Sequence, residues 1–452
     1  MVRETNNLSI LSENKLNKDL NKGFDTLKNK YSKLNFLFSS KELFDRLGYG
    51  FVAYQFIIIF FFLMGAPIFL VGLISGLKDL LTSLLSSIIE EYYEFKNIKS
   101  IFISKAGILF GFSFLLMALA IRLKSVWLFS VSFLISSVGV VTYGHLYKKL
   151  METSIKYERR SWFLQQITQY GLIITVIAFL ISGYILNHVG LNDTLYTFTI
   201  LGNTLSCPIN AYLIIFEIAA ILFIISGFIL SKLPDLKSKE HYPFNSFFSA
   251  YIHKIVSEIK IFKQNSKLKY LLVGVVLISV IQTFANTYYG YYIYLQFKDV
   301  FFKGFLNIAL IYSIAILISL ISLKFTNILR NRFGSSPIVV FGTLLSAILP
   351  LVLIFNPHFY VVIVANAVFV IGTTMASYSQ HYIVKNLLDQ TQLKIYYKSI
   401  GFVMILPYLV LVPLGALVAQ LLGLIILFKI IVLLLIFVYL PLNLTLVILS
   451  EK

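Results

Sequence analysis

The sequence is poor in the residues that usually carry redox or metal chemistry. It has one cysteine, two tryptophans and six histidines in 452 residues. The single cysteine, Cys207, excludes an internal disulfide framework and a cluster of thiolate metal ligands, so we expect it to be a small residue in a loop or at a helix end. Charged residues are also scarce, at 13% of the chain, whereas about a quarter is usual for a soluble domain. These shortages argue against redox chemistry and against a water-soluble fold.

Long apolar stretches dominate the chain instead. Hydrophobic residues make up 58% of it, and the mean hydropathy is +0.85. A helix needs about 20 mainly apolar residues to cross a hydrocarbon layer about 30 Å thick, and such stretches recur along the whole sequence. The sequence therefore predicts an all-α membrane protein with twelve transmembrane helices. We expect these helices near residues 50–73, 76–94, 103–121, 126–147, 163–186, 209–231, 270–294, 304–323, 337–355, 359–381, 399–421 and 424–448.

The predicted helices divide the chain into four parts. Residues 1–48 are polar and lack the features of a signal peptide, so we expect a cytoplasmic tail in which residues 34–47 form an amphipathic helix on the membrane surface. Residues 49–231 form a first six-helix bundle, 232–269 a cytoplasmic linker, and 270–452 a second six-helix bundle with a short cytoplasmic tail. The first two helices follow each other so closely that one re-entrant element is the alternative for that region.

The basic residues are distributed unevenly between the two predicted sides of the membrane. Lys and Arg gather in cytoplasmic loops, because their translocation is unfavourable. With the amino terminus inside, 32 of the 38 Lys and Arg fall on the cytoplasmic side, 5 fall outside, and Lys429 lies within the last helix. The distribution predicts that both termini are cytoplasmic in a cell-membrane protein. The net charge of +18 thus indicates orientation in the membrane, and we expect no nucleic-acid partner.

A short motif lies between predicted helices 8 and 9, where Asn327–Pro337 reads NILRNRFGSSP. It resembles the signature Gly-x-x-x-Asp-Arg-x-Gly-Arg-Arg of the major facilitator superfamily, found there in the equivalent cytoplasmic loop. Arg332 and Gly334 match this signature, and the loop between helices 2 and 3 keeps an acid, Glu91, at the place of the Asp. With six helices, a long basic loop and six more helices, the resemblance extends from Tyr49 to Glu451.

The resemblance implies two pseudo-symmetric bundles that rock against each other about a central cavity lined by helices 1, 4, 7 and 10. Predicted helix 7 carries polar residues three to four positions apart, which places them on one face. The alternative for these amides and tyrosines is a bridge between helices or a place in the aromatic belt at the membrane surface. As candidates that hydrogen-bond a solute in the cavity we select Tyr54, Gln55, Gln282, Asn286, Tyr289 and Asn366.

The two motif regions are the candidate gate. An acid near a helix end and a base across the seam between the bundles can form a charge-assisted contact that closes the cytoplasmic side. We assign this role to Glu91 and to Asn331, Arg332 and Gly334. The alternative is that Arg332 anchors the loop at the membrane surface and that Glu91 is a solvated helix end.

Two acids are candidates for proton coupling. Glu217 is flanked by apolar residues in predicted helix 6, so we expect it to be buried. Asp79 follows Lys78 at the predicted external start of helix 2, where a solvated pair at the rim is the alternative. The inner helices otherwise lack charges, and the sequence therefore predicts a neutral cavity.

We expect no enzymatic activity, because no motif for phosphate, zinc or nucleophilic catalysis appears and the loops are too short for a catalytic domain. No cofactor and no metal site are expected. The leading hypothesis is a secondary active or facilitative transporter that moves a small neutral or amphipathic solute by alternating access. Its expected partners are the lipid bilayer, the solute, and protons or sodium ions, and it is expected to be a monomer. The alternatives are a membrane-embedded lipid-handling transferase and a transport-inactive scaffold or receptor with the same fold.

Overall fold

The structure, a computed structural model, describes residues 34–95, 97–155, 157–188, 194–200, 203–236 and 266–451. In these ranges twelve helices are long and apolar enough to cross a membrane, which confirms the predicted number and a multi-pass membrane protein. We number them as spans 1 to 12. They cover Leu34–Leu63, Ile68–Ile89, Ser100–Arg122, Val126–Ser154, Gln165–His188, Ala211–Leu230, Lys269–Phe297, Gly304–Phe333, Ser335–Ile354, Phe359–Leu387, Ile400–Leu422 and Leu424–Leu449.

Several spans consist of more than one helical element. Spans 1 to 6 are formed by helical residues 34–51 with α2 (Tyr54–Leu63), then α3 (Ile68–Phe95), α4 (Ser100–Arg122), α5 (Val126–Ser154), α6 (Tyr157–His188) and α7 (Ala211–Leu230). Spans 7 to 12 are formed by α9 (Ser266–Phe284) with η1 (Ala285–Tyr289) and α10 (Gly290–Phe297), α11 (Gly304–Phe333), α12 (Ser335–Ser346) with α13 (Ile348–Ile354), α14 (Phe359–Leu387), α15 (Gln390–Val403) with α16 (Ile405–Leu422), and α17 (Leu424–Leu433) with η2 (Leu434–Tyr439) and α18 (Leu440–Glu451).

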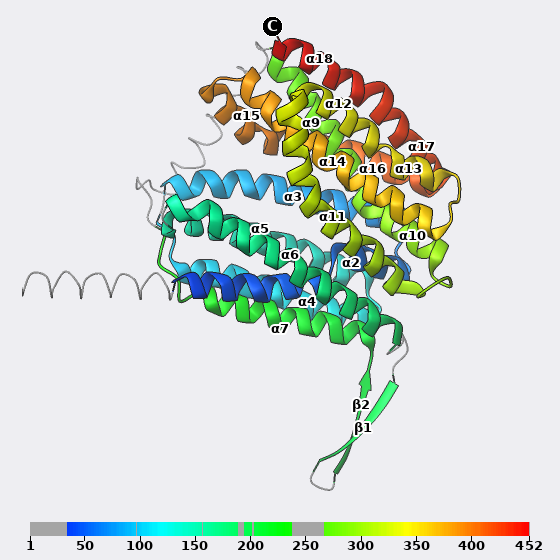
Figure 1. The fold of residues 1–452 in the computed structure, drawn as a ribbon. Coiled ribbons are helices and arrows are strands. Elements are labelled where there is room, and N and C mark those ends of the chain that lie inside the picture. The colour runs from blue at the N-terminus through cyan, green and yellow to red at the C-terminus, as the bar shows by residue number, and fades with distance from the viewer. Residues whose placement is uncertain are drawn as a thin grey trace, which may run out of the picture.

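The spans form two bundles, with the blue-to-green first bundle below the yellow-to-red second one in Figure 1. In the first bundle α4 packs against α5 and α7, and in the second α14 packs against α11 and α12. Across the seam, α3 lies along α16 and α6 lies along α11. Helices suit such a protein because every backbone polar group inside the hydrocarbon needs a partner within the chain.

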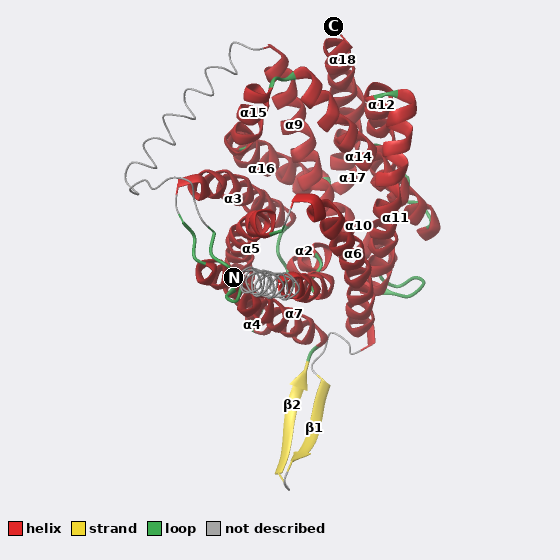
Figure 2. Ribbon diagram, turned by 60° about the vertical axis from the view of Figure 1, so that its left-hand side comes forward, coloured by secondary structure: helices red, strands yellow, loops and turns green. Residues whose placement is uncertain are grey.

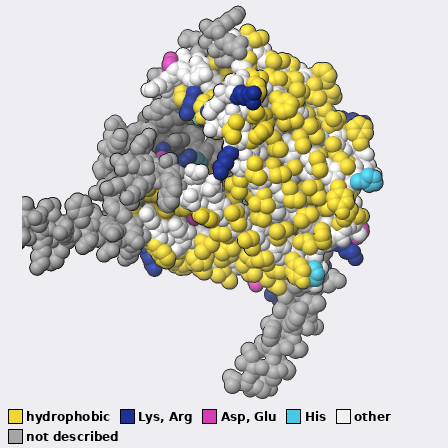
Figure 3. Space-filling model, in the orientation of Figure 1, with side chains coloured by type: hydrophobic (Ala, Val, Ile, Leu, Met, Phe, Trp, Pro, Cys, Tyr) yellow, Lys and Arg dark blue, Asp and Glu magenta, His cyan; other side chains and the backbone are white. Residues whose placement is uncertain are grey.

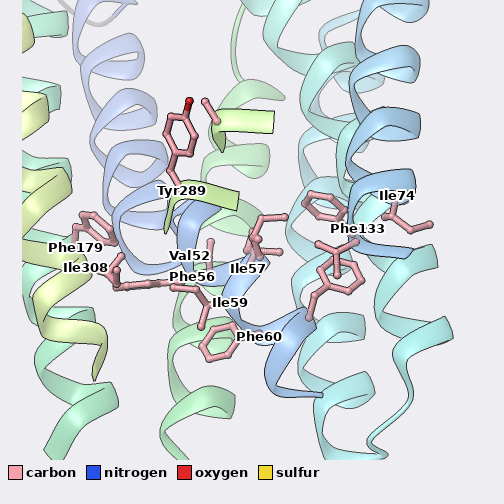
Figure 4. Packing of buried hydrophobic residues seen from close by; sticks show 14 of the residues in the cluster. Val52, Phe56, Ile57, Ile59, Phe60, Ile74, Phe133, Phe179, Tyr289 and Ile308 are labelled. Atoms are coloured by element: carbon pink, nitrogen blue, oxygen red, sulfur yellow. The ribbon is translucent and has the colours of Figure 1, made fainter. Parts of the chain in front are cut away.

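The core continues from one bundle into the other near α2, as Figure 4 shows for a set of its buried side chains. Phe56 lies 4.6 Å from Phe179 and 5.4 Å from Phe305, measured between ring centroids. Phe60 packs edge-on against Tyr212 at 4.5 Å. Aromatic rings of spans 1, 5, 6 and 8 therefore hold the two bundles together around α2.

The predicted bounds of the first span were wrong. The prediction began this helix at residue 50, whereas the structure begins it at Leu34 and ends it at Leu63. Residues 34–47 belong to the membrane-crossing helix and not to a separate surface helix, so the first bundle begins before residue 49. The charged side chains of this region had suggested a surface segment, but two of them are buried inside the bundle. Residues 1–33 of the predicted tail and 237–265 of the predicted linker lie outside the described residues.

A two-stranded hairpin interrupts the all-α pattern between spans 5 and 6. β1 (Thr194–Ile200) pairs antiparallel with β2 (Asn203–Ile209), in the register Thr194 opposite Ile209. Figure 2 shows both strands projecting from one end of the molecule. We call this the hairpin end. The opposite end carries the turns at Lys99, Lys232 and Gly334, and we call it the basic end.

Candidate functional site

The two bundles meet closely at the hairpin end. The rings of Phe62 in α2 and Tyr291 in α10 stack with their centroids 3.5 Å apart. The hydroxyl of Tyr288 donates to the carbonyl of Ile68 at 3.2 Å, and the amide N–H of Phe69 donates to Gln420 Oε1 at 2.8 Å. Spans 1, 2, 7 and 11 are thus joined across the seam at this end.

The basic end is open between the bundles. In the orientation of Figure 1, Figure 3 shows the surface hollowed at this end, with basic side chains at the edge of the hollow. The structure therefore has the geometry of a two-bundle protein that is closed at one end and accessible from the other.

Span 1 is interrupted in its second half. Ala53 has an extended backbone (φ −53°, ψ 142°) and separates residues 34–51 from α2. The carbonyl of Phe51, which loses its helical partner at the break, accepts a hydrogen bond from Ser182 of α6 at 2.8 Å. The break places Tyr54 and Gln55, two predicted cavity residues, in the first turn of α2.

Span 7 departs from α-helical geometry at the corresponding place. Residues Ala285–Tyr289 form the π-helical turn η1, which contains the predicted cavity residue Asn286. Single π-turns inside α-helices are frequent at functional sites, because they turn side chains out of the regular helical register. The two related spans, 1 and 7, are therefore both irregular near the middle of the membrane.

An ion pair lies beside these irregular segments, and its place corrects one prediction. Lys78 Nζ is 2.9 Å from Asp79 Oδ1, and the two side chains are 23% and 20% exposed. Asp79 is eleven residues from the start of α3 at Ile68, about 16 Å along the helix and close to the middle of a 30 Å layer. The predicted place at the external rim was therefore wrong.

The ion pair connects the bundles. Asp79 Oδ2 accepts a hydrogen bond of 2.5 Å from the hydroxyl of Thr283, which lies in α9 of the second bundle. The ammonium group of Lys78 lies 4.3 Å from the centre of the Tyr54 ring in α2. Tyr408 of α16 is an electrostatic neighbour of both charged groups. Spans 1, 2, 7 and 11 thus contribute to one polar site at the seam.

Gln282 and Asn286 are exposed, although their neighbours in span 7 are buried. On one side of them Thr283 contacts span 2 and Gly290 approaches Gln55 of span 1. On the other side Tyr289 contacts spans 10 and 12 through Phe369 and Phe428. The two exposed amides lie on the face of span 7 between these neighbours.

A pocket of about 230 Å³ lies beside α2, between the two bundles. Gln55 and Tyr312 are among its polar lining groups, and a Cβ built on Gly290 would lie within 3.4 Å of both side chains. Its walls come from spans 1 and 5 of the first bundle and spans 8 and 10 of the second. The full lining is Ala53, Gln55, Thr175, Phe179, Tyr312, Ala315, Ile316, Ser319 and Val370.

The structure places two other predicted cavity residues inside the second bundle. Tyr289 is buried between the rings of Phe369 and Phe428. Asn366 is buried and donates through Nδ2 to the carbonyl of Ile311 at 3.3 Å, so it bridges spans 10 and 8. This contact matches the alternative given for the amides in the sequence analysis, which was a hydrogen bond that bridges two helices.

The expected burial of Glu217 was wrong. Its side chain is exposed on α7, on the same face as the exposed side chains of Ile221, Ile225 and Phe228. An apolar row of this kind faces lipid in a membrane protein. Glu217 is therefore separated from the polar site at the seam, in contrast to Asp79.

At the basic end, the loop motif is held by its own bundle. Arg330 donates to Asn327 Oδ1 at 2.8 Å and to Asn331 Oδ1 at 3.0 Å, and its guanidinium lies 3.6 Å from the centre of the Tyr382 ring. Arg332, the predicted gate residue, is exposed. Gly334 ends α11 with a φ of +84°, a conformation that favours glycine. Glu91 lies in α3, and its side chain is outside the described residues.

Sequence reasoning missed a buried ionic cluster in the first bundle. Lys41 and Asp45, on helical residues 34–51, are 2% and 3% exposed, and their charged atoms are 2.5 Å apart. Asp45 also accepts hydrogen bonds from Ser226 of α7 at 2.5 Å and from Tyr143 of α5 at 3.2 Å. Lys41 Nζ lies 3.4 Å from the centre of the Tyr147 ring. The i,i+4 spacing of Lys41 and Asp45 within a run of apolar residues was the available signal.

Comparison with solved structures identifies the fold. The chain is similar to the nucleoside transporter NupG (TM-score 0.65, 11% identity, 93% of this chain and 99% of that one). It is also similar to a bacterial homologue of the iron transporter ferroportin in the inward-facing state (0.64, 14%, 93% and 99%) and to a D-xylose-proton symporter (0.59, 12%, 92% and 97%). No protein-family model and no curated protein sequence matches the chain. The chain therefore has the predicted fold of the major facilitator transporters.

Proposed function

We propose that this protein is a secondary transporter that moves a small polar or amphipathic solute without net charge by alternating access. The observation that carries the proposal is the polar site at the seam, where α2 and α3 of one bundle meet α9 and α16 of the other. The site lies between a closed hairpin end and a hollowed basic end. A solute bound there would contact both bundles, so it can favour one arrangement of the bundles over another.

The solute site comprises Tyr54 and Gln55 of α2 together with Gln282 and Asn286 of span 7. Amide and phenol groups donate and accept hydrogen bonds without adding charge. Lys78 and Asp79 neutralise each other at 2.9 Å, so the site offers charged hydrogen-bonding groups but little net charge. This composition fits a hydroxylated or heterocyclic solute better than a phosphate or a dicarboxylate, which normally needs an unpaired Arg or Lys.

The basic end faces the cytoplasm in this proposal, so the structure represents an inward-open state and both termini are cytoplasmic. The asymmetry of Lys and Arg in the sequence supports this orientation. Several basic residues assigned to loops lie within spans, among them Lys41, Arg46 and Lys78. Their removal from the comparison leaves the bias unchanged in direction.

Asp79 is the proposed coupling residue, and the proton is the proposed coupling ion. The Lys78 ammonium already occupies the cation position beside the carboxylate, which leaves protonation as the change that weakens this contact. Neutral Asp79 would hold Lys78 and Thr283 less tightly and would loosen the link between the bundles. The titratable groups that face Asp79 are Lys78 of its own helix, Tyr54 of α2 and Tyr408 of α16.

Uptake into proteoliposomes tests the transport proposal. We would assay labelled uridine, D-xylose and a divalent metal ion, as representatives of the solutes of the similar transporters, together with neutral amino acids. The double variant Gln282→Ala, Asn286→Ala should lower uptake of the transported solute about tenfold, because two hydrogen bonds of about 0.5–1.5 kcal/mol each are lost. Gln165→Ala, Gln169→Ala is the matched control, since it removes two amides, one exposed and one half-buried, at the same four-residue spacing near the start of α6.

Each alternative function gives a different result in this assay. A chain that moves no solute of the panel would favour a scaffold or receptor. A solute or lipid that is converted instead of moved would favour a membrane-embedded transferase. Equal uptake by wild type and the span 7 double variant would refute the assignment of the solute site.

Proton coupling has its own test. An inward proton gradient should accelerate uptake by the wild type, whereas Asp79→Asn should respond to the solute gradient alone. Thr283→Val is the control, because it removes the hydrogen bond between the bundles and leaves the carboxylate free to bind a proton. A gradient effect that survives Asp79→Asn would refute Asp79 as the coupling residue.

A further inference from the structure

The turn between spans 7 and 8 has an unusual backbone. Phe301 has a φ of +58° and Lys303 a φ of +65° with a ψ of 153°. The second combination lies in a region that is almost restricted to glycine, and such residues are strained by about 1–3 kcal/mol each. Gly304, at φ +42°, follows directly. A turn of this kind persists only where surrounding contacts hold it in place.

Two asparagines hold the turn. Asn307, 1% exposed in α11, donates through Nδ2 to the carbonyls of Phe297 at 2.8 Å and Val300 at 2.7 Å. Asn187, at the end of α6, donates to the carbonyls of Phe302 at 2.8 Å and Lys303 at 2.7 Å. Asn187 Oδ1 in turn accepts from the amide N–H of Phe305 at 3.1 Å.

The two asparagines differ in the bundle to which they belong. Asn307 and the turn are parts of the second bundle, so their hydrogen bonds persist in any arrangement of the bundles. Asn187 belongs to the first bundle, and its three hydrogen bonds exist only while the hairpin end is closed. A single amide therefore satisfies two carbonyls and one N–H of a strained turn in the other bundle.

We infer that Asn187 and the turn at Phe301–Gly304 form a latch that sets the balance between the closed and open hairpin end. The amide of Asn187 holds the turn in its strained form, and separation of the bundles lets the turn relax. The hydrogen bonds favour closure and the backbone strain favours opening, so the two contributions partly offset each other. The latch rests on the proposed function only in taking the bundles to separate at this end.

The latch predicts opposite effects for two substitutions. Asn187→Ala removes the three hydrogen bonds and should shift the ratio of closed to open hairpin ends about tenfold toward open, which is about 1.4 kcal/mol. Lys303→Gly removes the strain at an exposed position and should shift the ratio several-fold toward closed. Lys298→Gly removes a neighbouring exposed lysine whose φ of −59° is ordinary, so it should leave the ratio unchanged.

Two further variants separate the latch from a general loss of structure. Asn307→Ala should lower the thermal stability without an equal shift of the ratio, because its bonds lie within one bundle. His188 is the exposed neighbour of Asn187, and its ring stacks on Tyr184 of the same helix. His188→Ala should leave both the thermal stability and the ratio of closed to open hairpin ends unchanged.

Distances between paired spin labels on the full-length protein in lipid nanodiscs measure the ratio. Labels replace Leu123 and Phe355, two exposed residues at the hairpin end of different bundles, in a Cys207→Ser background. A second pair at Thr153 and Phe333 reports the basic end.

This measurement needs no transported solute, so failure of the transport assay and failure of the latch are distinguishable. Opposite shifts for Asn187→Ala and Lys303→Gly, with an inverse change at the basic end, support the latch. Equal distance distributions for wild type and both variants overturn it, as does a shift of the same size in Lys298→Gly.

Discussion

The buried pair of Lys41 and Asp45 makes the sharpest prediction for stability. Asp45→Ala removes the carboxylate that accepts from Lys41, Ser226 and Tyr143. The Lys41 ammonium then remains at 2% exposure, beside the Tyr147 ring. Breaking a buried ion pair by removal of one partner costs about 3–5 kcal/mol, because an uncompensated charge stays behind.

For Asp45→Ala we expect a loss of stability at the lower end of this range of about 3–5 kcal/mol. Glu42 Oε1 lies 3.8 Å from Lys41 Nζ and can take over part of the interaction. Glu42 also pairs with Arg46 at 3.3 Å, at side-chain exposures of 15% and 30%, where ion pairs contribute about 0–1 kcal/mol. Asp45→Ala should therefore cost about 3 kcal/mol and Glu42→Gln less than about 1 kcal/mol.

Size-exclusion chromatography of the detergent-solubilised protein after heating gives the relative thermal stability of each variant. The double variant Lys41→Met, Asp45→Leu is the decisive comparison, since it removes both charges and should recover most of the stability lost in Asp45→Ala. If the double variant is as unstable as the single one, the loss reflects packing around residue 45 and not an unpaired charge. If Asp45→Ala is no less stable than Glu42→Gln, the pair is not buried as the structure shows.

Three further predictions concern the seam and the basic end. Gly72→Ala would place a Cβ 2.1 Å from the hydroxyl oxygen of Tyr288 in the other bundle, so it should increase the open fraction reported by the hairpin-end spin labels. Gly334→Ala should destabilise the protein by about 1–3 kcal/mol in the same heating assay, because its φ of +84° is strained for alanine. Asp235 accepts from the Ser100 N–H at 2.7 Å, which lowers the pKa of Asp235. The stability that the Asp235 carboxylate contributes is therefore present above the usual pKa of an aspartate, about 3.9, and is lost as pH falls through the lowered pKa. Wild type and Asp235→Ala should differ in stability at neutral pH and should converge in acid.

The number and order of the spans could be predicted because each apolar run is long enough by itself to cross the membrane. The first span was misplaced for the same reason. A hydropathy average counts Lys41 and Asp45 as charges on a surface, whereas packing against Tyr143 and Ser226, about a hundred and two hundred residues away, buries them. The positions of such partners follow from the assembled bundle and not from local sequence.

The candidate site was predictable in part. Tyr54, Gln55, Gln282 and Asn286 were selected by spacing and by the symmetry of spans 1 and 7. Tyr54, Gln55 and Asn286 lie at the irregular segments of those spans, and Gln282 lies in α9 just before the π-turn. Asp79 was assigned to the rim because the polar residues of α3 suggested a helix that starts at residue 76. The structure begins α3 earlier, at Ile68. The predicted start at residue 76 is eight residues later than the start at Ile68, and this difference moves the ion pair about 12 Å along the helix axis, from the surface toward the middle of the membrane.

The break at Ala53 and the π-turn at Ala285–Tyr289 relate the site to the motion. A helix with all its hydrogen bonds made is stiff, whereas interruptions of the hydrogen-bond ladder are the places at which helices bend. Both interruptions lie next to the Asp79–Thr283 contact and between the closed hairpin end and the open basic end. In the proposed transport cycle, a solute or proton that alters this contact would act at the points where spans 1 and 7 bend most easily. Under this proposal, a small change at one carboxylate would be converted into a rearrangement of whole bundles, because the contact joins the bundles beside both interruptions.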